Sequence, residues 1–209
     1  MAYLATNFGV SILDVEREEF GNTYTLDKVT YSSIGLNDFI YVATEKGLYR
    51  GDIHTNLLDA ANWIFLDKEV YANLEVFEKS LIALKAKGSA YIINLTDSSP
   101  EFFCKGPINF IHRADGRLIV GNQTNVSVYT TPTTWEEHDF DTPVTYLTVA
   151  GDTYWSCNEN SGLNGYQYNR KNKKVEQIAT SIMPNRPIRN HCQYLNFVTD
   201  DRMLVAGGC

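Results

Sequence analysis

A short strand–turn–strand pattern recurs along the chain and constrains its fold more than any other feature. Its clearest copy is residues 41–52 (YVATEKGLYRGD), and residues 3–14 (YLATNFGVSILD) repeat it near the N-terminus. β-Branched and aromatic residues favour strands, and the glycine between them favours a turn. Six copies can be aligned on a short, mainly apolar strand segment, which we call the anchor. The anchors lie near positions 4, 42, 82, 119, 155 and 205, at steps of 38, 40, 37, 36 and 50 residues. A strand-rich period near 40 residues is typical of a β-propeller blade.

Each period contains the same four strands, of which the anchor is the second. We expect first strands at 29–34, 70–77, 108–112, 144–149 and 193–198. Third strands are expected at 9–14, 47–52, 88–95, 125–129 and 165–169, and more polar fourth strands at 20–25, 63–66, 101–104, 135–140 and 175–179. The sequence therefore predicts an all-β fold. We expect residues 1–209 to form a single partial β-propeller with about five blades' worth of four-stranded antiparallel repeats.

The pattern begins and stops at an anchor strand, near Leu4 and near Val205. Propellers close by pairing strands from both termini within one blade. We therefore expect a fragment of a seven-bladed ring, with further blades before Tyr3 and after Cys209. Open blade edges tend to pair with another chain. We expect this fragment to dimerise through those edges.

Composition excludes some classes of protein. The formal net charge is −7 and the pI about 5.1, which argues against a general nucleic-acid binder. The densest basic run, residues 170–174 (RKNKK), lies between two strand-like segments. We interpret it as a solvated hairpin tip, with a phosphate-binding patch as the alternative. No apolar run of about 18 residues is long enough for a membrane span, and no signal peptide is visible.

The chemistry-bearing residues form no catalytic motif. The sequence has no Gly-rich phosphate loop, GxSxG or HExxH, so we predict no catalytic residue, cofactor or metal. Glu136 and His138 share one face of a predicted strand, and they are only two ligands for zinc. A solvated acidic strand is the simpler interpretation. His191 and Cys192 would point to opposite faces of a strand and cannot form a dyad with each other.

The four cysteines contain no CxxC pair, and a reduced, scattered set is preferred over disulfides.

Three other features invite a binding interpretation. Trp63 and Trp135 begin equivalent strands, where we expect them to cover the seam between blades, with sugar stacking as the alternative. Residues 181–189 contain two prolines and two arginines, which indicates a surface loop. Because loops carry function more often than strands, Arg186 and Arg189 are candidate partner-binding residues, although a spacer between two blades is the preferred interpretation of the segment.

The repeat also resembles known families. Residues 3–14 and 41–50 resemble the two-component regulator propeller repeat. The run 56–63 (NLLDAANW) resembles the N-terminal propeller of PorZ-like proteins of Bacteroidetes, and the resemblance is strongest over 3–66 and 204–208. This resemblance implies a secreted protein with two propellers and a C-terminal sorting domain. It also implies a non-enzymatic role in type IX secretion, at the cell surface, in a complex that handles anionic lipopolysaccharide. It transfers no functional residue.

Three functions remain open from the sequence. The first is a non-catalytic binding or scaffold propeller of the cell envelope, either periplasmic or at the outer-membrane surface, which binds other envelope secretion proteins or lipopolysaccharide and glycan. The second is the periplasmic ligand-sensing propeller of a hybrid two-component regulator, a class that recognises glycan fragments. The third is a propeller lyase or glycosidase, which would need clustered carboxylates or a metal at the central channel. We favour the first.

Overall fold

A computed structural model provides the structure of the chain. It describes residues 1–209 except 87, 159–161, 173, 183–191, 200–201 and 208–209, and from residue 179 onward it describes only the backbone of the strands. The chain divides into two compact units, Met1–Gly106 and Pro107–Cys209, each of which is described by itself. No helix within the described residues is long and apolar enough to cross a membrane.

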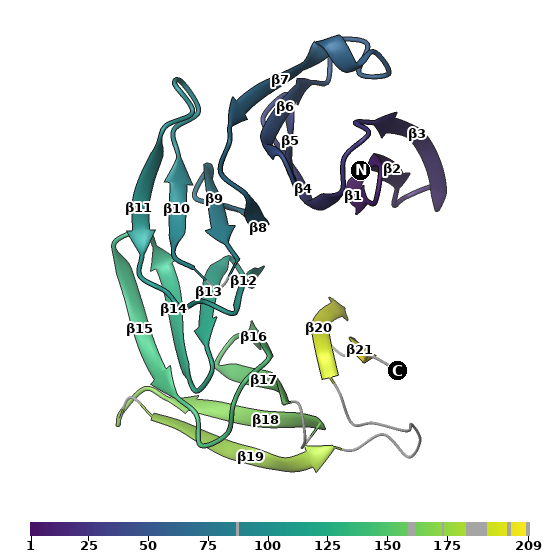
Figure 1. Cartoon of the computed structure of the whole chain (residues 1–209). Coiled ribbons are helices and arrows are strands. Elements are labelled where there is room, and N and C mark those ends of the chain that lie inside the picture. Colours follow the sequence, from purple (N-terminus) through teal and green to yellow (C-terminus); the bar gives the residue numbers. More distant parts are fainter. Residues whose placement is uncertain (87, 159–161, 173, 183–191, 200–201, 208–209) are drawn as a thin grey trace. The chain divides into compact units, whose positions relative to one another are not determined.

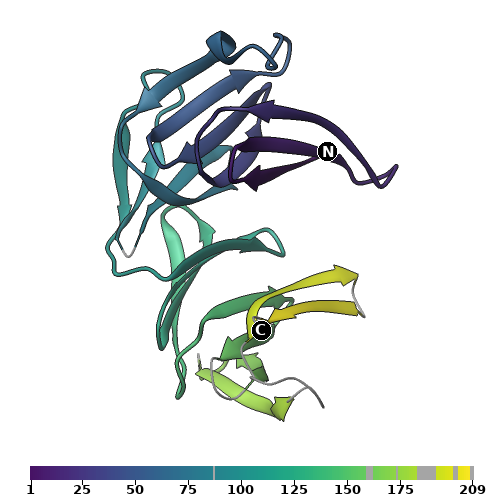
Figure 2. The ribbon, with the colours of Figure 1, turned by 45° about the vertical axis from the view of Figure 1, so that its right-hand side comes forward.

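The first unit contains three antiparallel sheets (Figure 1). Sheet 1 comprises β1 (Ala2–Thr6), β2 (Gly9–Asp14) and β3 (Glu19–Thr25). Sheet 2 comprises β4 (Thr30–Leu36), β5 (Phe39–Thr44), β6 (Gly47–Asp52) and β7 (Trp63–Asp67), with the 3₁₀ helix η1 (Ala60–Asn62) just before β7. Sheet 3 comprises β8 (Tyr71–Phe77), β9 (Ser80–Lys85), β10 (Ala90–Ile93) and β11 (Pro100–Cys104). Figure 2 shows the three strands of sheet 1 in purple.

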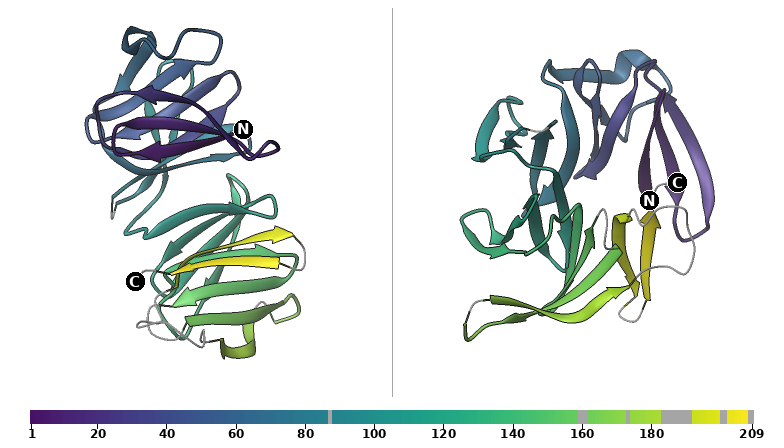
Figure 3. Two further views of the ribbon diagram at one scale, coloured as in Figure 1. Left: turned by 90° about the vertical axis from the view of Figure 1, so that its right-hand side faces the viewer. Right: turned by 60° about the horizontal axis from the view of Figure 1, so that its bottom comes forward.

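The second unit is built in the same way. Sheet 4 comprises β12 (Phe110–Ala114), β13 (Arg117–Asn122), β14 (Asn125–Thr131) and β15 (Thr134–Asp139). Sheet 5 comprises β16 (Tyr146–Ala150), β17 (Thr153–Asn158), β18 (Gly162–Asn169) and β19 (Lys174–Ile182). Sheet 6 is the hairpin of β20 (Cys192–Thr199) and β21 (Arg202–Gly207), drawn in yellow in Figure 3.

The predicted all-β fold is confirmed. In each sheet the strands pair in the order in which the chain makes them, which is the antiparallel meander expected of a blade. Strands β2 and β6 have the predicted bounds, whereas β18 begins three residues earlier than predicted. Within the described residues the sheets contain about five blades' worth of strands. The single partial propeller and the seven-bladed ring stay predictions.

The hairpin turns follow from their sequences. Asp115 and Gly116 both have positive φ, of 48° and 71°, as a type I′ turn requires, and Asp-Gly favours this turn. Glu78 and Lys79 adopt the same left-handed region, at 49° and 63°, without a glycine. The hairpin geometry there overrides the local preference of both residues.

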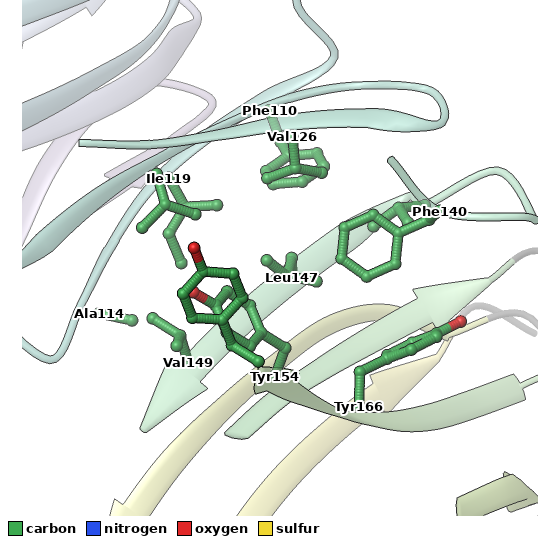
Figure 4. Close-up of a cluster of buried hydrophobic side chains, with 12 residues drawn as sticks. Phe110, Ala114, Ile119, Val126, Phe140, Leu147, Val149, Tyr154 and Tyr166 are labelled. Carbon is green, nitrogen blue, oxygen red and sulfur yellow. The ribbon is translucent and has the colours of Figure 1, made fainter. Parts of the chain in front are cut away.

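The cores of both units lie at seams, by which we mean the packed interfaces between successive sheets. The 2–3 seam joins sheets 2 and 3 through mainly aliphatic residues, including Leu48, Leu74 and Leu81. The 4–5 seam joins sheets 4 and 5, and Figure 4 shows Tyr154 lying among Ile119, Leu147 and Val149. Burying side chains of this kind contributes about 1.5–3 kcal/mol each.

Candidate binding site between sheets 4 and 5

A polar pocket of about 290 Å³ lies at one end of the 4–5 seam. This volume is close to the lower limit of roughly 300–1,000 Å³ for small-molecule sites. Sheet 4 contributes Arg117, Val128, Thr130 and Glu136, and sheet 5 with its turns contributes Asp152, Tyr154, Tyr168 and Arg170. Two cations, two anions and two phenols therefore face one small space.

Arg117 is held by a turn of its own sheet and by a turn of the next. Its Nη2 atom donates to Asp115 Oδ2 at 2.6 Å and to the carbonyl oxygen of Gly151 at 2.5 Å. The Gly151 amide in turn donates to Asp115 Oδ2 at 2.9 Å. The hydrogen bonds that Asp115 accepts from Arg117 and from the Gly151 amide lower the pKa of its carboxyl, and the Arg117 hydrogen bond is the larger cause. The Asp115–Gly116 and Gly151–Asp152 hairpins are thereby fixed side by side.

Arg170 forms the second ion pair of the pocket. Its Nη2 and Nε atoms donate to Asp152 Oδ1 at 2.7 and 3.1 Å. The side chain of Arg170 is 76% exposed, so this pair lies at the mouth of the pocket rather than in the core. The Asp152 carbonyl accepts from the Tyr168 amide at 2.8 Å, which fixes the turn against β18. Exposed ion pairs stabilise little because water screens them, so this pair shapes the site more than it stabilises the fold.

The two tyrosines form the wall of the pocket, and both remain protonated at neutral pH. Burial raises the pKa of Tyr154 to about 12. Burial and a hydrogen bond to the Glu136 carboxylate raise the pKa of Tyr168. Tyr154 and Tyr168 pack edge to face with ring centroids 6.2 Å apart. The wall therefore offers aromatic rings and neutral hydroxyls beside a carboxylate.

Two histidines lie in the same seam, His138 against the tyrosines of the pocket and His112 against Tyr146, with ring centroids 4.9 Å apart. His138 is 2% exposed and packs its ring against Tyr154 and Tyr168, with centroids 5.3 and 4.8 Å away. Its Nε2 atom lies 3.4 Å from the Tyr154 hydroxyl, and its buried Nδ1 atom has no hydrogen-bond partner within the described residues. Desolvation lowers the pKa of His138, and it lowers that of His112 to about 4. Both rings are therefore neutral at pH 7.

The interpretation of β15 as a solvated acidic strand is confirmed for its acidic side chains, which are exposed, and wrong for His138. Glu136 lines the pocket, and His138 is buried in the seam. The alternation of side chains along β15 was predicted, but His138 faces aromatic rings of sheet 5 that only the tertiary fold brings near it. Within the described residues no group of three or more His, Cys, Asp or Glu side chains could hold a metal ion.

The prediction for the two tryptophans is confirmed for Trp63 and wrong for Trp135. Trp63 is 7% exposed and covers the seam between sheets 1 and 2, where its Nε1 atom donates to the Leu57 carbonyl at 3.0 Å. Trp135 is 49% exposed and stacks on Tyr129. The cause is the residue paired across the strand. Gly51 leaves room beside Trp63, whereas Tyr129 fills that place beside Trp135.

Several other predictions concern residues that do not line the pocket. Arg186, Arg189 and His191 lie outside the described residues, as does the side chain of Cys192. The predicted preference for reduced cysteines is wrong for Cys157, which is disulfide-bonded, while Cys104 is not in a disulfide.

In the basic run 170–174, Arg170 binds Asp152. The Lys171 and Lys174 amides donate to Asn169 and Asn172 side chains, as in a hairpin tip.

Sequence reasoning missed Arg117, Asp152, Tyr154 and Tyr168 as site residues. In the sequence, Arg117 and Asp152 stand in segments typical of turns, and the tyrosines stand in strand-like segments, so neither pattern indicates a site. A usable signal existed, because the Asp-Gly-Arg and Gly-Asp turns occupy the same place in successive repeats. Corresponding turns of neighbouring sheets lie close together, so charged residues there can meet.

Comparison with known proteins supports the fold. Residues 1–64 match the family model of the N-terminal β-propeller domain of PorZ, a type IX secretion protein. The resemblance to PorZ-like propellers predicted from the sequence is thereby confirmed for this part of the chain. No curated protein sequence matches the chain.

Solved structures match nearly the whole chain at low identity. PorZ of Porphyromonas gingivalis, described as an essential bacterial surface component of the type IX secretion system, is 20% identical with a TM-score of 0.72. The extracellular domain of BT4673 from B. thetaiotaomicron, described as a hybrid two-component system, is 16% identical with a TM-score of 0.71. Coverage of this chain is 100% and 98%, but it spans only 28% and 31% of those chains. The designed protein Ika8 is 8% identical with a TM-score of 0.61, and 98% of this chain and 64% of that chain are covered. The chain therefore has the β-propeller fold.

Proposed function

We propose that the chain is a non-catalytic binding or scaffold propeller of a cell-envelope protein, acting as PorZ-like proteins do in type IX secretion and surface attachment. The observation that carries this proposal is the match of residues 1–64 to the PorZ propeller model. Its partners would be other envelope secretion proteins, or lipopolysaccharide and glycan. Ion pairs and hydrogen bonds hold the charged groups of the 4–5 pocket in place, and such a preformed arrangement suits binding.

The disulfide at Cys157 supports a location in the periplasm or at the outer-membrane surface. Disulfides persist in oxidising compartments and are rare in the cytosol. Mass spectrometry of the native protein after thiol alkylation measures this directly. A Cys157 that is fully alkylated without prior reduction would remove this support.

Affinity purification from envelope fractions tests the proposed role. A tagged form of the natural protein should recover outer-membrane secretion proteins, and the purified chain should show no turnover of glycan or peptide substrates. Recovery of no secretion protein under crosslinking conditions would contradict the proposal.

The likeness to BT4673 favours a second candidate, the ligand-sensing propeller of a hybrid two-component regulator. The coding sequence of the parent gene decides between the two. A membrane span followed by a kinase domain beyond Cys209 would establish the sensor, and a sorting domain would establish the secretion protein.

We also propose that the isolated chain self-associates through a sheet edge. Within the described residues β1 pairs only with β2, so its other edge lacks a strand partner. Unpaired edges readily accept a strand from another chain. Light scattering at increasing concentration should show a dimer, and a monomer at high concentration would contradict this.

A further inference from the structure

Two positive and two negative charges line the pocket of the 4–5 seam, and Asp115, which pairs with Arg117, adds a third negative charge to the cluster. Arg117 is paired with Asp115, and Arg170 is paired with Asp152. Glu136 has no ion-pair partner within the described residues, and its carboxylate is hydrogen-bonded to the neutral Tyr168 hydroxyl. With Asp115 counted, this cluster of five charged side chains carries one net negative charge at neutral pH, and Glu136 is its member without an ion pair within the described residues.

The surroundings of Glu136 strengthen this preference for positive charge. The Tyr168 hydroxyl contacts the carboxylate, and the rings of Tyr154 and Tyr168, which both line the pocket, pack edge to face. The negative faces of aromatic rings attract cations within about 6 Å of the ring centroid. The buried His138 stays neutral, and the two cations that act on these groups, Arg117 and Arg170, are paired with Asp115 and Asp152. An anionic ligand, in contrast, would meet the unpaired carboxylate of Glu136.

We propose that this pocket binds a protonated organic amine, with the ammonium group on the Glu136 carboxylate and against the Tyr168 ring. The Tyr168 hydroxyl and the Thr130 side chain offer further oxygen acceptors for ammonium protons. The volume of about 290 Å³ admits a small amine or one lysine side chain rather than a folded segment. This inference goes beyond the proposed envelope role and does not depend on it, because it rests on residues 115–170 alone.

Neighbouring residues on β15 provide a matched pair of variants. Glu136 and Glu137 are both exposed glutamates, but Glu136 pairs with Val128 and lines the pocket, while Glu137 pairs with Ser127 on the opposite face. Glu136→Gln and Glu137→Gln remove the same charge from adjacent positions of one strand. A general electrostatic effect would change both variants alike, whereas a built site distinguishes them.

The test is an NMR titration of the whole chain with cadaverine and, separately, with N-acetyl-lysine amide. Inorganic phosphate and glucose serve as the anionic and neutral probes. We expect at least one amine to shift the amide resonances of Asp152 and Tyr168 saturably. Glu136→Gln should weaken that binding by about tenfold or more, which corresponds to one charge-assisted hydrogen bond. Glu137→Gln should leave it unchanged.

The two amines distinguish the source of the ligand. Tighter binding of cadaverine indicates a free amine, and tighter binding of the lysine derivative indicates a lysine of a partner protein. Tyr168→Phe keeps the ring and should retain most of the affinity, while Tyr168→Leu should lose it, which keeps the test valid should Glu136→Gln unfold. The proposal is overturned if neither amine binds, if both glutamine variants bind alike, or if phosphate or glucose binds more tightly than both amines.

Discussion

The 2–3 seam and the 4–5 seam have the same backbone plan but different interiors. Counting from the hairpin ends, His112, Tyr154 and Tyr168 of the 4–5 seam correspond to three aliphatic residues of the 2–3 seam. Those residues are Ile34, Leu81 and Leu95, all of which pack in that core. At these three positions the 2–3 seam is aliphatic and the 4–5 seam carries titratable rings, while the tyrosines of the 2–3 seam, Tyr41 and Tyr71, lie at other positions.

The two seams also carry their arginines at different positions of the repeat. In the 2–3 seam Arg50 lies over the Phe39 ring, 4.5 Å from its centroid, and caps the core with a cation–π contact. In the 4–5 seam Arg117 occupies the place of Phe39, and Val128 occupies that of Arg50. Arg117 is drawn toward Asp115 and Gly151 instead. The same repeat therefore yields a closed seam in one unit and a polar pocket in the other.

The largest expected effect is the loss of a core side chain from the closed seam. Leu81→Ala removes a side chain that is 0% exposed, and we expect it to lower the free energy of unfolding by about 2–5 kcal/mol. Urea unfolding followed by tryptophan fluorescence measures this. Val70→Ala, at a position 41% exposed, is the control and should change stability by less than about 0.5 kcal/mol. Equal effects of the two variants would contradict the assignment of this core.

The second expected effect is acid sensitivity from His112. Its pKa is lowered to about 4 in the folded state, so below the unfolded value of about 6.5 the unfolded chain binds the extra proton. Stability should therefore fall as pH decreases from 6.5 to 4, by at most roughly 3 kcal/mol from this group. His112→Ile, which installs the residue of the closed seam, should remove that part of the loss. Parallel stability–pH curves for the variant and the parent would argue against this contribution of His112.

The third expected effect is alkaline sensitivity from Tyr154. The folded protein keeps the phenol proton up to about pH 12, while the unfolded chain loses it near pH 10. Stability should fall as pH rises from 10 to 12, by roughly 2–3 kcal/mol from this residue. Tyr154→Phe should show a smaller fall by that amount in denaturant titrations at each pH. The idea fails if the variant and the parent lose stability equally.

The smallest expected effect concerns the two tryptophans. A methyl group at Gly51 would lie 2.7 Å from Leu57 Cδ2 and 2.9 Å from Trp63 Cζ3. Gly51→Ala should therefore cost about 1–3 kcal/mol and increase the exposure of Trp63, as in the arrangement of Trp135. Gly21→Ala, where the nearest atom is 3.7 Å away, is the control. Thermal unfolding and iodide quenching of fluorescence report both changes, and an unchanged Trp63 would contradict the account.

Sequence reasoning reached the strands and the fold because period, turns and strand composition all agreed. The sequence alone did not predict on which face of its sheet each side chain lies. Thr44 pairs with Gly47 at one hairpin end and Asn122 with Asn125 at another, so residue 44 corresponds to 122. Aligning the anchors at 42 and 119 is one residue out of step. Because side chains alternate along a strand, that offset exchanges the two faces of a sheet.

The pocket required the same missing information. Arg117 and Asp152 meet only because adjacent hairpins are joined through the Gly151 backbone. The burial of His138 depends on Tyr154 and Tyr168, which come from another sheet. Local patterns predict elements, whereas sites between sheets need the register and packing of both partners.

The most direct test of the central claim is the titration of the histidine rings by NMR. The 4–5 seam buries polar rings at positions that the 2–3 seam fills with aliphatic side chains. The pKa of His112 should therefore be about 4, and that of His138 should be below its usual value. If both rings titrated at or above their usual pKa, the seam would be open to water and the account would be wrong.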